Sequence, residues 1–245
     1  MIAPSSGRRY IARPAAGPGD LAAVQALRTR AFGLTRADSD AFDAQCTHIV
    51  VEDRREGRLV AGFRLMPLAG ADITRSYAAQ FYDLTALAGY PGRITELGRF
   101  CVDPAARDPD ILRAAWGQIT AHVDDKGVAL LIGCTSFLGT DPAPYRQAFA
   151  ALAAHHLAPP AWRPQRRTAN AVPLAGEVTD PAAARAMMPP LLRSYLGMGG
   201  WVSDHAVIDP AMNTIHVFTG LEIARIPEAR KRRLRSTLDG DRAAR

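Results

Sequence analysis

The spacing of apolar residues along the chain predicts a mixture of helices and strands. Apolar stripes at helical spacing predict helices over residues 18–32, 109–126, 145–156 and 191–198. Short apolar runs rich in β-branched and aromatic residues predict strands over residues 10–13, 48–52, 58–66, 95–104, 128–134 and 214–223. This order is typical of a mixed α/β sheet. We expect one domain over residues 1–225, with a C-terminal extension from about residue 176.

One predicted strand, residues 95–104, carries charge within an apolar run. A buried charge is costly unless it is paired or used, and this strand holds both Glu96 and Arg99. Side chains alternate along a strand, so residues three apart should point to opposite faces. A β-bulge at Leu97 and Gly98 would bring both charges to one face and leave backbone N–H groups unpaired. A carboxylate beside such N–H groups suits carbonyl chemistry. The alternative is a Glu–Arg pair that only stabilises the sheet.

Most of the formal net charge of +6 lies at the C-terminus. Residues 225–245 contain eight basic and three acidic side chains, and we expect residues 226–245 to form a basic, flexible tail. The tail is either a solvated terminus or a contact for anionic lipid headgroups or an acidic protein. It has no aromatic residue on which a base could stack, so nucleic acid is not an expected partner.

Cysteine usage and the lengths of the apolar runs predict a cytoplasmic protein. The three cysteines, Cys46, Cys101 and Cys134, are odd in number and far apart, which is typical of reduced thiols. The N-terminus has basic residues but no apolar segment behind them, so we predict no signal peptide. The longest apolar run, residues 128–132, is far too short to span a bilayer.

Several segments resemble motifs of the acyl-homoserine-lactone autoinducer synthases, which have a GNAT-like fold and take acyl chains from acyl carrier protein. These segments are Leu27-Arg28 with Phe32, Asp40-Ala41-Phe42-Asp43, Gly62-Phe63-Arg64-Leu65, Phe81, and Glu96-Leu97-Gly98-Arg99-Phe100. Further motifs are similar to those of the hemolysin-like, ornithine-lipid-forming L-ornithine N-alpha-acyltransferase family. They are Asp43-x-x-Cys46-x-His48, Gly133-Cys134-Thr135-Ser136-Phe137-x-Gly139-x-Asp141-Pro142 and Pro189-Pro190-Leu191-Leu192-x-x-Tyr195-Leu196. The resemblance covers roughly residues 8 to 225 and implies a GNAT-like mixed sheet with a bulged, splayed central strand.

The resemblance implies transfer of a 3-hydroxyacyl group from acyl carrier protein to the α-amine of L-ornithine. The product would be lyso-ornithine lipid, formed in the first step of ornithine lipid biosynthesis at the inner face of the cytoplasmic membrane. The donor would be carried on the phosphopantetheine of the carrier protein, and we expect no separate cofactor and no metal. Residues 103–110 agree, because they lack the glycines that cradle the CoA pyrophosphate and contain three acidic residues.

The same resemblance implies roles for single residues. Glu96 is the expected general base for the α-ammonium, and backbone N–H groups of the bulge would stabilise the oxyanion. Tyr145 occupies the place where many GNAT enzymes have a Tyr that protonates the leaving thiolate. Cys101 adjoins the central motif, but no neighbour in the sequence favours a reactive thiolate, so we do not expect it to accept the acyl group.

The expected substrate-binding residues are Arg28, Phe32, Asp40, Asp43, Arg64, Phe81, Arg99, Phe100 and Ser136. An Arg of this set would bind the carboxylate of the amino acid, an Asp would bind its cationic side chain, and the phenylalanines would line an acyl tunnel. Alternatively, the charged members form only an ion-pair network that fixes the N-terminal loop over the sheet, and the aromatic members belong to the core. The spacing of Asp43, Cys46 and His48 fits no usual zinc site.

Three other functions stay open. The first is acyl transfer to another amino acid, such as glutamine. The second is an autoinducer synthase that uses S-adenosylmethionine, although the Trp that those enzymes carry shortly after the Phe32 position is replaced here by Leu34-Thr35-Arg36. The third is a lipid-surface binding protein without enzymatic activity, which acts through its basic tail.

Overall fold

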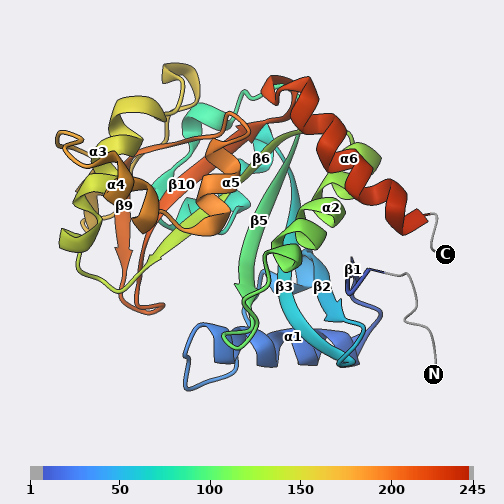
Figure 1. The fold of residues 1–245 in the computed structure, drawn as a ribbon. Helices are drawn as coiled ribbons and strands as arrows, with labels where there is room; N and C mark the ends of the chain where they lie inside the picture. The colour runs from blue at the N-terminus through green and yellow to red at the C-terminus, as the bar shows by residue number, and fades with distance from the viewer. Residues whose placement is uncertain (1–7, 243–245) are drawn as a thin grey trace, which may run out of the picture. The chain divides into compact units, whose positions relative to one another are not determined.

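The computed structural model describes residues 8–242 and shows the mixed α/β fold that the sequence predicts (Figure 1). The chain divides into two compact units. Unit 1 consists of the residues up to Leu65, Arg99–Gly127 and the segment from Glu228 onward, and unit 2 consists of Met66–Gly98 and Val128–Pro227. Each unit contains its own helices and its own section of sheet. The expectation of one domain over residues 1–225 stays a prediction.

Most strands are hydrogen-bonded in the order β1-β2-β3-β5-β6-β10-β9-β8. Their bounds are β1 Tyr10–Pro14, β2 Thr47–Asp53, β3 Arg58–Ala69, β5 Arg93–Val102, β6 Val128–Leu138, β8 Ala171–Pro173, β9 Trp201–Asp209 and β10 Thr214–Glu222. Strands β3 and β5 run from one unit into the other, so each unit contains a section of both. The short strands β4 (Tyr82–Asp83) and β7 (Gln165–Arg166) pair with each other in unit 2.

The helices predicted from the apolar stripes are present as α1, α2, α3 and α5. The α-helices are α1 Pro18–Ala31, α2 Pro109–Lys126, α3 Arg146–His155, α4 Pro181–Met187, α5 Pro190–Leu196 and α6 Glu228–Arg242. Short 3-10 helices lie between them: η1 Asp43–Gln45, η2 Gly70–Arg75, η3 Ala78–Gln80, η4 Thr85–Leu87, η5 Ala143–Tyr145, η6 Pro160–Trp162 and η7 Ile223–Arg225. No helix within residues 8–242 has the length and hydropathy needed to cross a bilayer.

Helix α1 packs closely on β3 in unit 1. Val24 and Leu27, which the sequence places on the apolar face of the helix, are fully buried. A Cβ at Gly62 of β3 would lie 2.2 Å from Val24 Cγ2, so this approach of helix and strand requires glycine. Strands β2 and β3 form the predicted hairpin, and its turn contains Gly57 at a φ of 63°. The first helix is thereby fixed directly on the strand that carries Arg64.

Helix α2 begins and ends at the predicted caps. Asp108 Oδ1 accepts a hydrogen bond from the N–H of Asp110 at 2.9 Å, and Gly127 ends the helix in the left-handed conformation with a φ of 59°. Ile111 and Ile119 of the predicted apolar stripe are almost completely buried. Local sequence signals therefore account for this helix.

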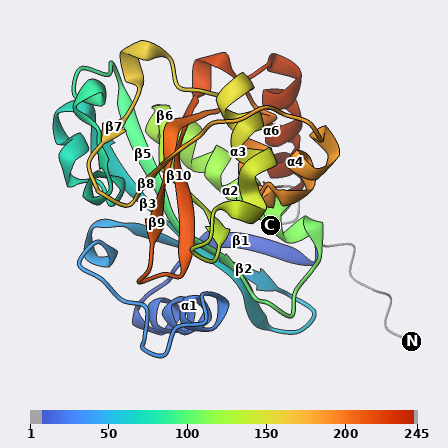
Figure 2. The same cartoon turned by 90° about the vertical axis from the view of Figure 1, so that its left-hand side faces the viewer.

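The basic C-terminal segment contains helix α6, whereas the sequence predicted a flexible tail over residues 226–245. This helix lies alongside α2 in Figures 1 and 2. The guanidinium group of Arg235 donates two hydrogen bonds to the carboxylate of Asp124 on α2, at 3.0 and 2.9 Å. Such a bidentate pair fixes geometry as well as charge. The partner carboxylate lies 111 residues earlier in the chain, so the tail's own composition does not reveal it.

Unit 2 is built around the long strands β6 and β10 (Figure 2). The two strands pair antiparallel over residues 130–138 of β6 and 214–222 of β10. On its other edge β6 pairs in parallel with β5, and β9 and β8 extend the sheet beyond β10. Side chains from α3, α5 and these strands form a buried core that includes Phe137, Phe149, Leu152, Leu192, Val202 and Ile215.

Candidate functional site

Unit 1 holds a closed ring of alternating arginines and aspartates. Its members, in order around the ring, are Arg28, Asp43, Arg64, Asp40, Arg99 and Asp38. Each arginine is paired with two aspartates, and each aspartate is paired with two arginines. Helix α1, the segment that follows it, β3 and β5 all contribute residues. The ring therefore joins four parts of unit 1 through balanced charge.

Arg28 is the most buried member of the ring, with a side-chain exposure of 1%. Its Nη1 and Nη2 donate to the two carboxylate oxygens of Asp43 at 2.9 and 2.8 Å. Its Nε lies 2.8 Å from Asp38 Oδ2. A bidentate pair of this kind has strict geometry. Arg28 thus holds the segment after α1 against the helix itself.

The opposite side of the ring is the part that solvent reaches. Arg64 donates to Asp43 at 2.6 Å and to Asp40 at 3.0 Å, and its side chain is 3% exposed. Arg99 Nη2 lies 3.1 Å from Asp40 Oδ2. The side chains of Asp40 and Arg99 are 24% and 12% exposed. A charged ligand can therefore compete for the Asp40–Arg99 corner more easily than for the rest of the ring.

The ring stabilises the ionised form of its aspartates. Burial alone would raise the pKa of Asp43, but hydrogen bonds from Arg28 and Arg64 outweigh that effect and hold its pKa well below the usual value. The pKa of Asp40 is lowered in the same way by Arg64 and Arg99 against the effect of burial. Hydrogen bonds to Asp40 and Asp43 likewise raise the pKa of Arg64 despite its burial. All three groups are charged at neutral pH.

The backbone of β5 is irregular next to this ring. Arg99 has a φ of 51°, which is the left-handed region that non-glycine residues rarely adopt. The sequence predicted an irregularity at Leu97 and Gly98, and the residue with positive φ is instead Arg99. The guanidinium contacts with Asp38 and Asp40 give a physical reason, because they hold the Arg99 side chain while the strand turns. Whether Glu96 and Arg99 share one site stays a prediction.

The parallel ladder between β5 and β6 in unit 2 ends at Glu96 and Ile132, although β6 continues to Leu138. A Cβ at Gly133 would lie 2.4 Å from the backbone oxygen of Leu97, so this close approach requires glycine. The strand that carries Glu96 therefore leaves its pairing with β6 directly after this residue.

The carboxylate of Glu96 accepts two backbone hydrogen bonds. The N–H of Tyr77 lies 2.7 Å from Oε2, and the N–H of Ala78 lies 2.8 Å from Oε1. Glu96 is 3% exposed, and both donors lie at the start of η3. Two such bonds hold the carboxylate in one orientation. Glu96 also fixes the segment that leads to Phe81.

Phe81 packs against two aromatic neighbours in unit 2. Its ring centroid lies 5.4 Å from that of Tyr77 and 4.7 Å from that of His216 on β10. His216 lies opposite Ser136 of β6 in the antiparallel ladder, and Ser136 is exposed. The structure therefore brings the two predicted residues Phe81 and Ser136 to the surroundings of one buried histidine.

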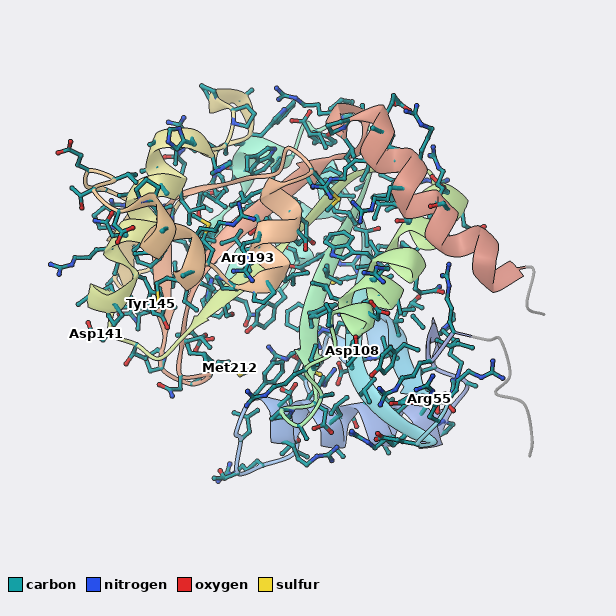
Figure 3. All side chains as sticks on the ribbon, in the orientation of Figure 1. Arg55, Asp108, Asp141, Tyr145, Arg193 and Met212 are labelled. Carbon is teal, nitrogen blue, oxygen red and sulfur yellow. The ribbon has the colours of Figure 1, made fainter. Side chains whose placement is uncertain are left out.

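The remaining predicted aromatic residues have structural contacts. Phe100 stacks on Phe63 with ring centroids 5.5 Å apart, and Phe32 ends α1 with its N–H donating to Arg28 O at 2.9 Å. Tyr145 lies at the start of α3 (Figure 3), and its hydroxyl donates to Leu138 O at 2.6 Å. A Tyr145 that protonates a thiolate must first release this bond. Their substrate roles stay predictions.

Comparison with curated proteins identifies the family. The L-ornithine N(alpha)-acyltransferase of Rhodobacter capsulatus is 37% identical over 189 residues, which is 74% of this chain and 73% of that protein. The protein of the same name from Rhizobium meliloti is 32% identical over 239 residues, which is 87% of this chain and 80% of that protein. The chain belongs to the L-ornithine N(alpha)-acyltransferase family. The family resemblance stated from the sequence is thus confirmed.

The fold of this L-ornithine N(alpha)-acyltransferase family member is that of the GNAT enzymes. Residues 24–117 match the family model described as an acetyltransferase (GNAT) domain. The structure of FeeM, an N-acyl amino acid synthase from uncultured soil microbes, aligns with a TM-score of 0.51 and 10% sequence identity, over 88% of this chain and 92% of FeeM. The likeness to FeeM shows the fold, whereas the curated relatives and the GNAT family model identify an acyltransferase.

Sequence reasoning missed three features of the site in this family member. Asp38 completes the ring but lies in none of the motifs named above. The predicted members contained three arginines and two aspartates, and this imbalance was the signal that a further acidic residue was needed. The backbone donors of Tyr77 and Ala78 come from 19 and 18 residues before Glu96, so no local pattern indicates them. His216 lies in no recognised sequence motif.

Cys101 is expected to be unreactive in this acyltransferase. The residue is 4% exposed, and burial raises the pKa of its thiol to about 12. We expect iodoacetamide at neutral pH to leave Cys101 unmodified in the folded protein, and a Cys101→Ala variant to keep its acyl-transfer activity. Peptide mass mapping, with the partly exposed Cys46 and Cys134 as internal controls, checks the first point. Alkylation of the native Cys101 thiol, or loss of activity in a folded variant, would contradict it.

Proposed function

We propose that this protein transfers a 3-hydroxyacyl group from acyl carrier protein to the α-amine of L-ornithine and so forms lyso-ornithine lipid, the first step of ornithine lipid biosynthesis. The match to curated proteins named L-ornithine N(alpha)-acyltransferase, over most of both chains, carries this proposal. The ring in unit 1 supports it, because a zwitterionic amino acid with a cationic side chain is recognised by paired charges of both signs.

The Asp40–Arg99 corner is the proposed site for the charged groups of ornithine. Arg99 would bind the α-carboxylate and Asp40 the side-chain ammonium, since these two members of the ring are the most exposed. The buried members Arg28, Asp43 and Arg64 keep the corner in place. Removing the charge of Asp40 or Arg99 should therefore raise the KM for ornithine while the variant still folds.

Glu96 is the proposed general base. It takes a proton from the α-ammonium of ornithine, directly or through a water molecule, and the free amine attacks the thioester carbon. Backbone N–H groups of the irregular β5 segment stabilise the oxyanion of the tetrahedral intermediate. The C–S bond then breaks, Tyr145 donates its proton to the leaving thiolate, and the nitrogen gives its second proton back to the Tyr145 phenolate, so that a neutral amide and a free thiol result. No nucleophilic side chain is needed, because the thioester is already activated.

A carrier protein is the proposed donor in preference to CoA. The N-terminus of α2, where a pyrophosphate would bind, is already capped by the carboxylate of Asp108, and Asp110 lies in the first turn. Asp103 accepts a hydrogen bond from the N–H of Ala105 at 2.9 Å in the same connection. These carboxylates repel a pyrophosphate, whereas the phosphopantetheine arm of a carrier protein has a single phosphate.

The direct test supplies purified protein with L-ornithine and either 3-hydroxyacyl carrier protein or the 3-hydroxyacyl-CoA of the same chain. We expect acyl-ornithine in the mass spectrum with the carrier-protein donor, formed at a rate at least about ten-fold above that with CoA. Equal or faster reaction with CoA would remove the carrier protein from the proposal. The absence of acyl-ornithine with both donors would overturn the function itself.

Helix α6 is the proposed contact with the anionic inner face of the cytoplasmic membrane. Arg230 and Arg232 are exposed on this helix, and each cation near an anionic surface contributes roughly 1 kcal/mol. We expect the double variant Arg230→Glu, Arg232→Glu to bind vesicles containing anionic lipid at least about ten-fold more weakly while keeping its acyl-transfer rate in detergent.

The matched control for this charge change lies in the β2–β3 turn of the same unit. Arg54 and Arg55 are also exposed, so the double variant Arg54→Glu, Arg55→Glu changes the net charge equally without touching α6. Vesicle co-sedimentation at low and high salt measures both variants. Equal weakening by the two variants, or no effect of the α6 variant, would refute a membrane contact through α6.

A further inference from the structure

His216 of β10 is a buried histidine with one ring nitrogen that lacks a partner. The residue is 3% exposed and lies opposite Ser136 of β6 and Val207 of β9. Its Nε2 has no hydrogen-bond partner among residues 8–242. Buried polar atoms without a partner are uncommon in native proteins, and each needs a physical explanation.

The contacts of Tyr82 assign the proton on this imidazole. Tyr82 Oη lies 2.8 Å from the backbone oxygen of His216 and 3.1 Å from its Nδ1. A carbonyl oxygen only accepts, so the phenolic proton is donated to it, and Nδ1 must donate its own proton to Oη. In the neutral ring, Nε2 is then an acceptor with a free lone pair.

The imidazole of His216 stays neutral at neutral pH. Burial, together with the nearby His205, lowers the pKa of His216 to about 4. The tautomer assigned from Tyr82 therefore describes the ring under physiological conditions. The result is an acceptor that can bind an O–H or N–H donor but carries no charge.

Phe81 connects the surroundings of His216 to Glu96. The ring of Phe81 meets the imidazole of His216 edge-on, with an interplanar angle of 76°. Phe81 is partly exposed, and it follows the segment whose Tyr77 and Ala78 N–H groups are held by Glu96. One short segment of unit 2 thus joins the proposed base to the ring that packs against His216.

We propose that His216 Nε2 accepts a hydrogen bond from a hydroxyl group on the acyl chain and thereby selects hydroxyacyl donors over unsubstituted ones. This inference rests on the proposed function, because it needs an acyl chain beside Phe81. The ring of Phe81 suits an alkyl chain, and the lone pair of His216 Nε2 suits one hydroxyl group on that chain. A site with an otherwise unpaired acceptor disfavours the analogue that lacks the hydroxyl. A neighbouring side chain moves when the chain binds, because Nε2 has no solvent exposure of its own.

His205 of β9 offers a matched control. Its Nδ1 lies 2.7 Å from Asp204 Oδ1, its Nε2 also lacks a partner among the described residues, and it is fully buried. Its ring lies against Tyr82, with centroids 5.2 Å apart, whereas the ring of Phe81 packs against Tyr77 and His216. A substitution at His205 therefore removes a similar nitrogen from the same unit without removing the proposed acceptor.

The experiment compares kcat/KM for a 3-hydroxyacyl carrier protein and for the unsubstituted acyl carrier protein of equal chain length, with ornithine as acceptor. The wild-type enzyme should prefer the hydroxyacyl donor by about ten- to hundred-fold. His216→Asn keeps a donor toward Tyr82 and removes Nε2, so its preference should fall to within about three-fold. His205→Asn should keep the wild-type preference. An unchanged preference in folded His216→Asn, or the same loss in His205→Asn, would overturn the assignment.

A second measurement needs no substitution. In nitrogen NMR of the wild-type protein, the Nε2 resonance of His216 should move upfield when a 3-hydroxy fatty acid binds, because the ring nitrogen then accepts a hydrogen bond. The chemical shift of this resonance should not change when the unsubstituted fatty acid binds. A resonance unmoved by the bound hydroxy acid would reject the contact. Two outcomes distinguish this inference from the proposed function. If the wild-type protein makes acyl-ornithine equally well from both donors, the role of His216 is rejected and the proposed function stands. If it makes no acyl-ornithine from either donor, the proposed function is rejected.

Discussion

Replacing Glu96 by glutamine is expected to slow acyl transfer to ornithine by about 10²–10⁴-fold, the usual contribution of a general base. The α-ammonium of an amino acid is protonated at neutral pH, and the glutamine amide cannot remove that proton. The carboxylate also binds the N–H groups of Tyr77 and Ala78, and glutamine has only one acceptor oxygen for these two donors. We therefore also expect a loss of stability of about 1–3 kcal/mol.

A variant of the same segment separates these two effects. Ser76 Oγ donates to Ile73 O at 2.7 Å and accepts from the N–H of Ala79 at 3.2 Å. Ser76→Ala loosens this segment but leaves the Glu96 carboxylate in place. Single-turnover rates and thermal unfolding of both variants give the comparison. Similar rate losses in Ser76→Ala and Glu96→Gln would make Glu96 a structural clamp, and full activity of Glu96→Gln would remove it from the mechanism.

Replacing Arg64 by leucine is expected to reduce the free energy of unfolding by about 3–5 kcal/mol. The side chain is 3% exposed and neutralises Asp40 and Asp43, so its loss leaves two aspartates with an incomplete set of partners in a poorly solvated place. Arg58→Leu on the same strand is the control. Its side chain is 39% exposed, and its ion pairs with Glu56 and Asp103 should contribute no more than about 1 kcal/mol. Equal decreases in the free energy of unfolding of the two variants, measured by urea denaturation, would show that the ring stabilises the fold no more than an exposed ion pair does.

The stability of Arg64→Leu and that of the wild type should depend differently on pH in acid. The folded-state pKa values of Asp40 and Asp43 lie below the unfolded-state value, so the stability that they contribute is complete above the unfolded-state pKa, near pH 4, and is lost as the pH falls through the folded-state pKa values. Arg64→Leu removes one cause of the depression. Its free energy of unfolding should therefore fall less steeply below pH 4 than that of the wild type. Identical slopes would mean that Arg64 does not set these pKa values.

Local signals were sufficient for some elements and not for others. Helix α2 was predictable because a cap, a stripe and a terminal glycine all lie within its own sequence. Strand β9 was not, because Ser203, Asp204 and His205 interrupt its apolar pattern. The structure shows how the strand tolerates this: the register with β10 shifts there, and Ser203 Oγ accepts from the N–H of Phe218 at 3.1 Å in place of a backbone oxygen. Such a substitute bond depends on the partner strand.

The candidate site divides in the same way. Motif resemblance supplied five of the six members of the ring, which all lie in recognisable motifs: Arg28, Asp40, Asp43, Arg64 and Arg99. It did not supply Asp38, and it gave no sign that the charges close into a ring, because closure depends on how α1, β3 and β5 lie in unit 1. The unpaired Nε2 of His216 is likewise a property of packing. Residue types were predictable here, whereas their partners were not.

The central claim is that this protein acylates the α-amine of L-ornithine. The measurement that tests it most directly is a competition in one reaction, with 3-hydroxyacyl carrier protein as donor and equal amounts of ornithine, glutamine, lysine and glycine as acceptors. Tandem mass spectrometry and NMR then identify the acylated amino acid and the nitrogen that carries the acyl group. The account predicts that Nα-acyl-ornithine dominates the products. Predominant acylation of another amino acid, or of the side-chain amine of ornithine, would contradict it.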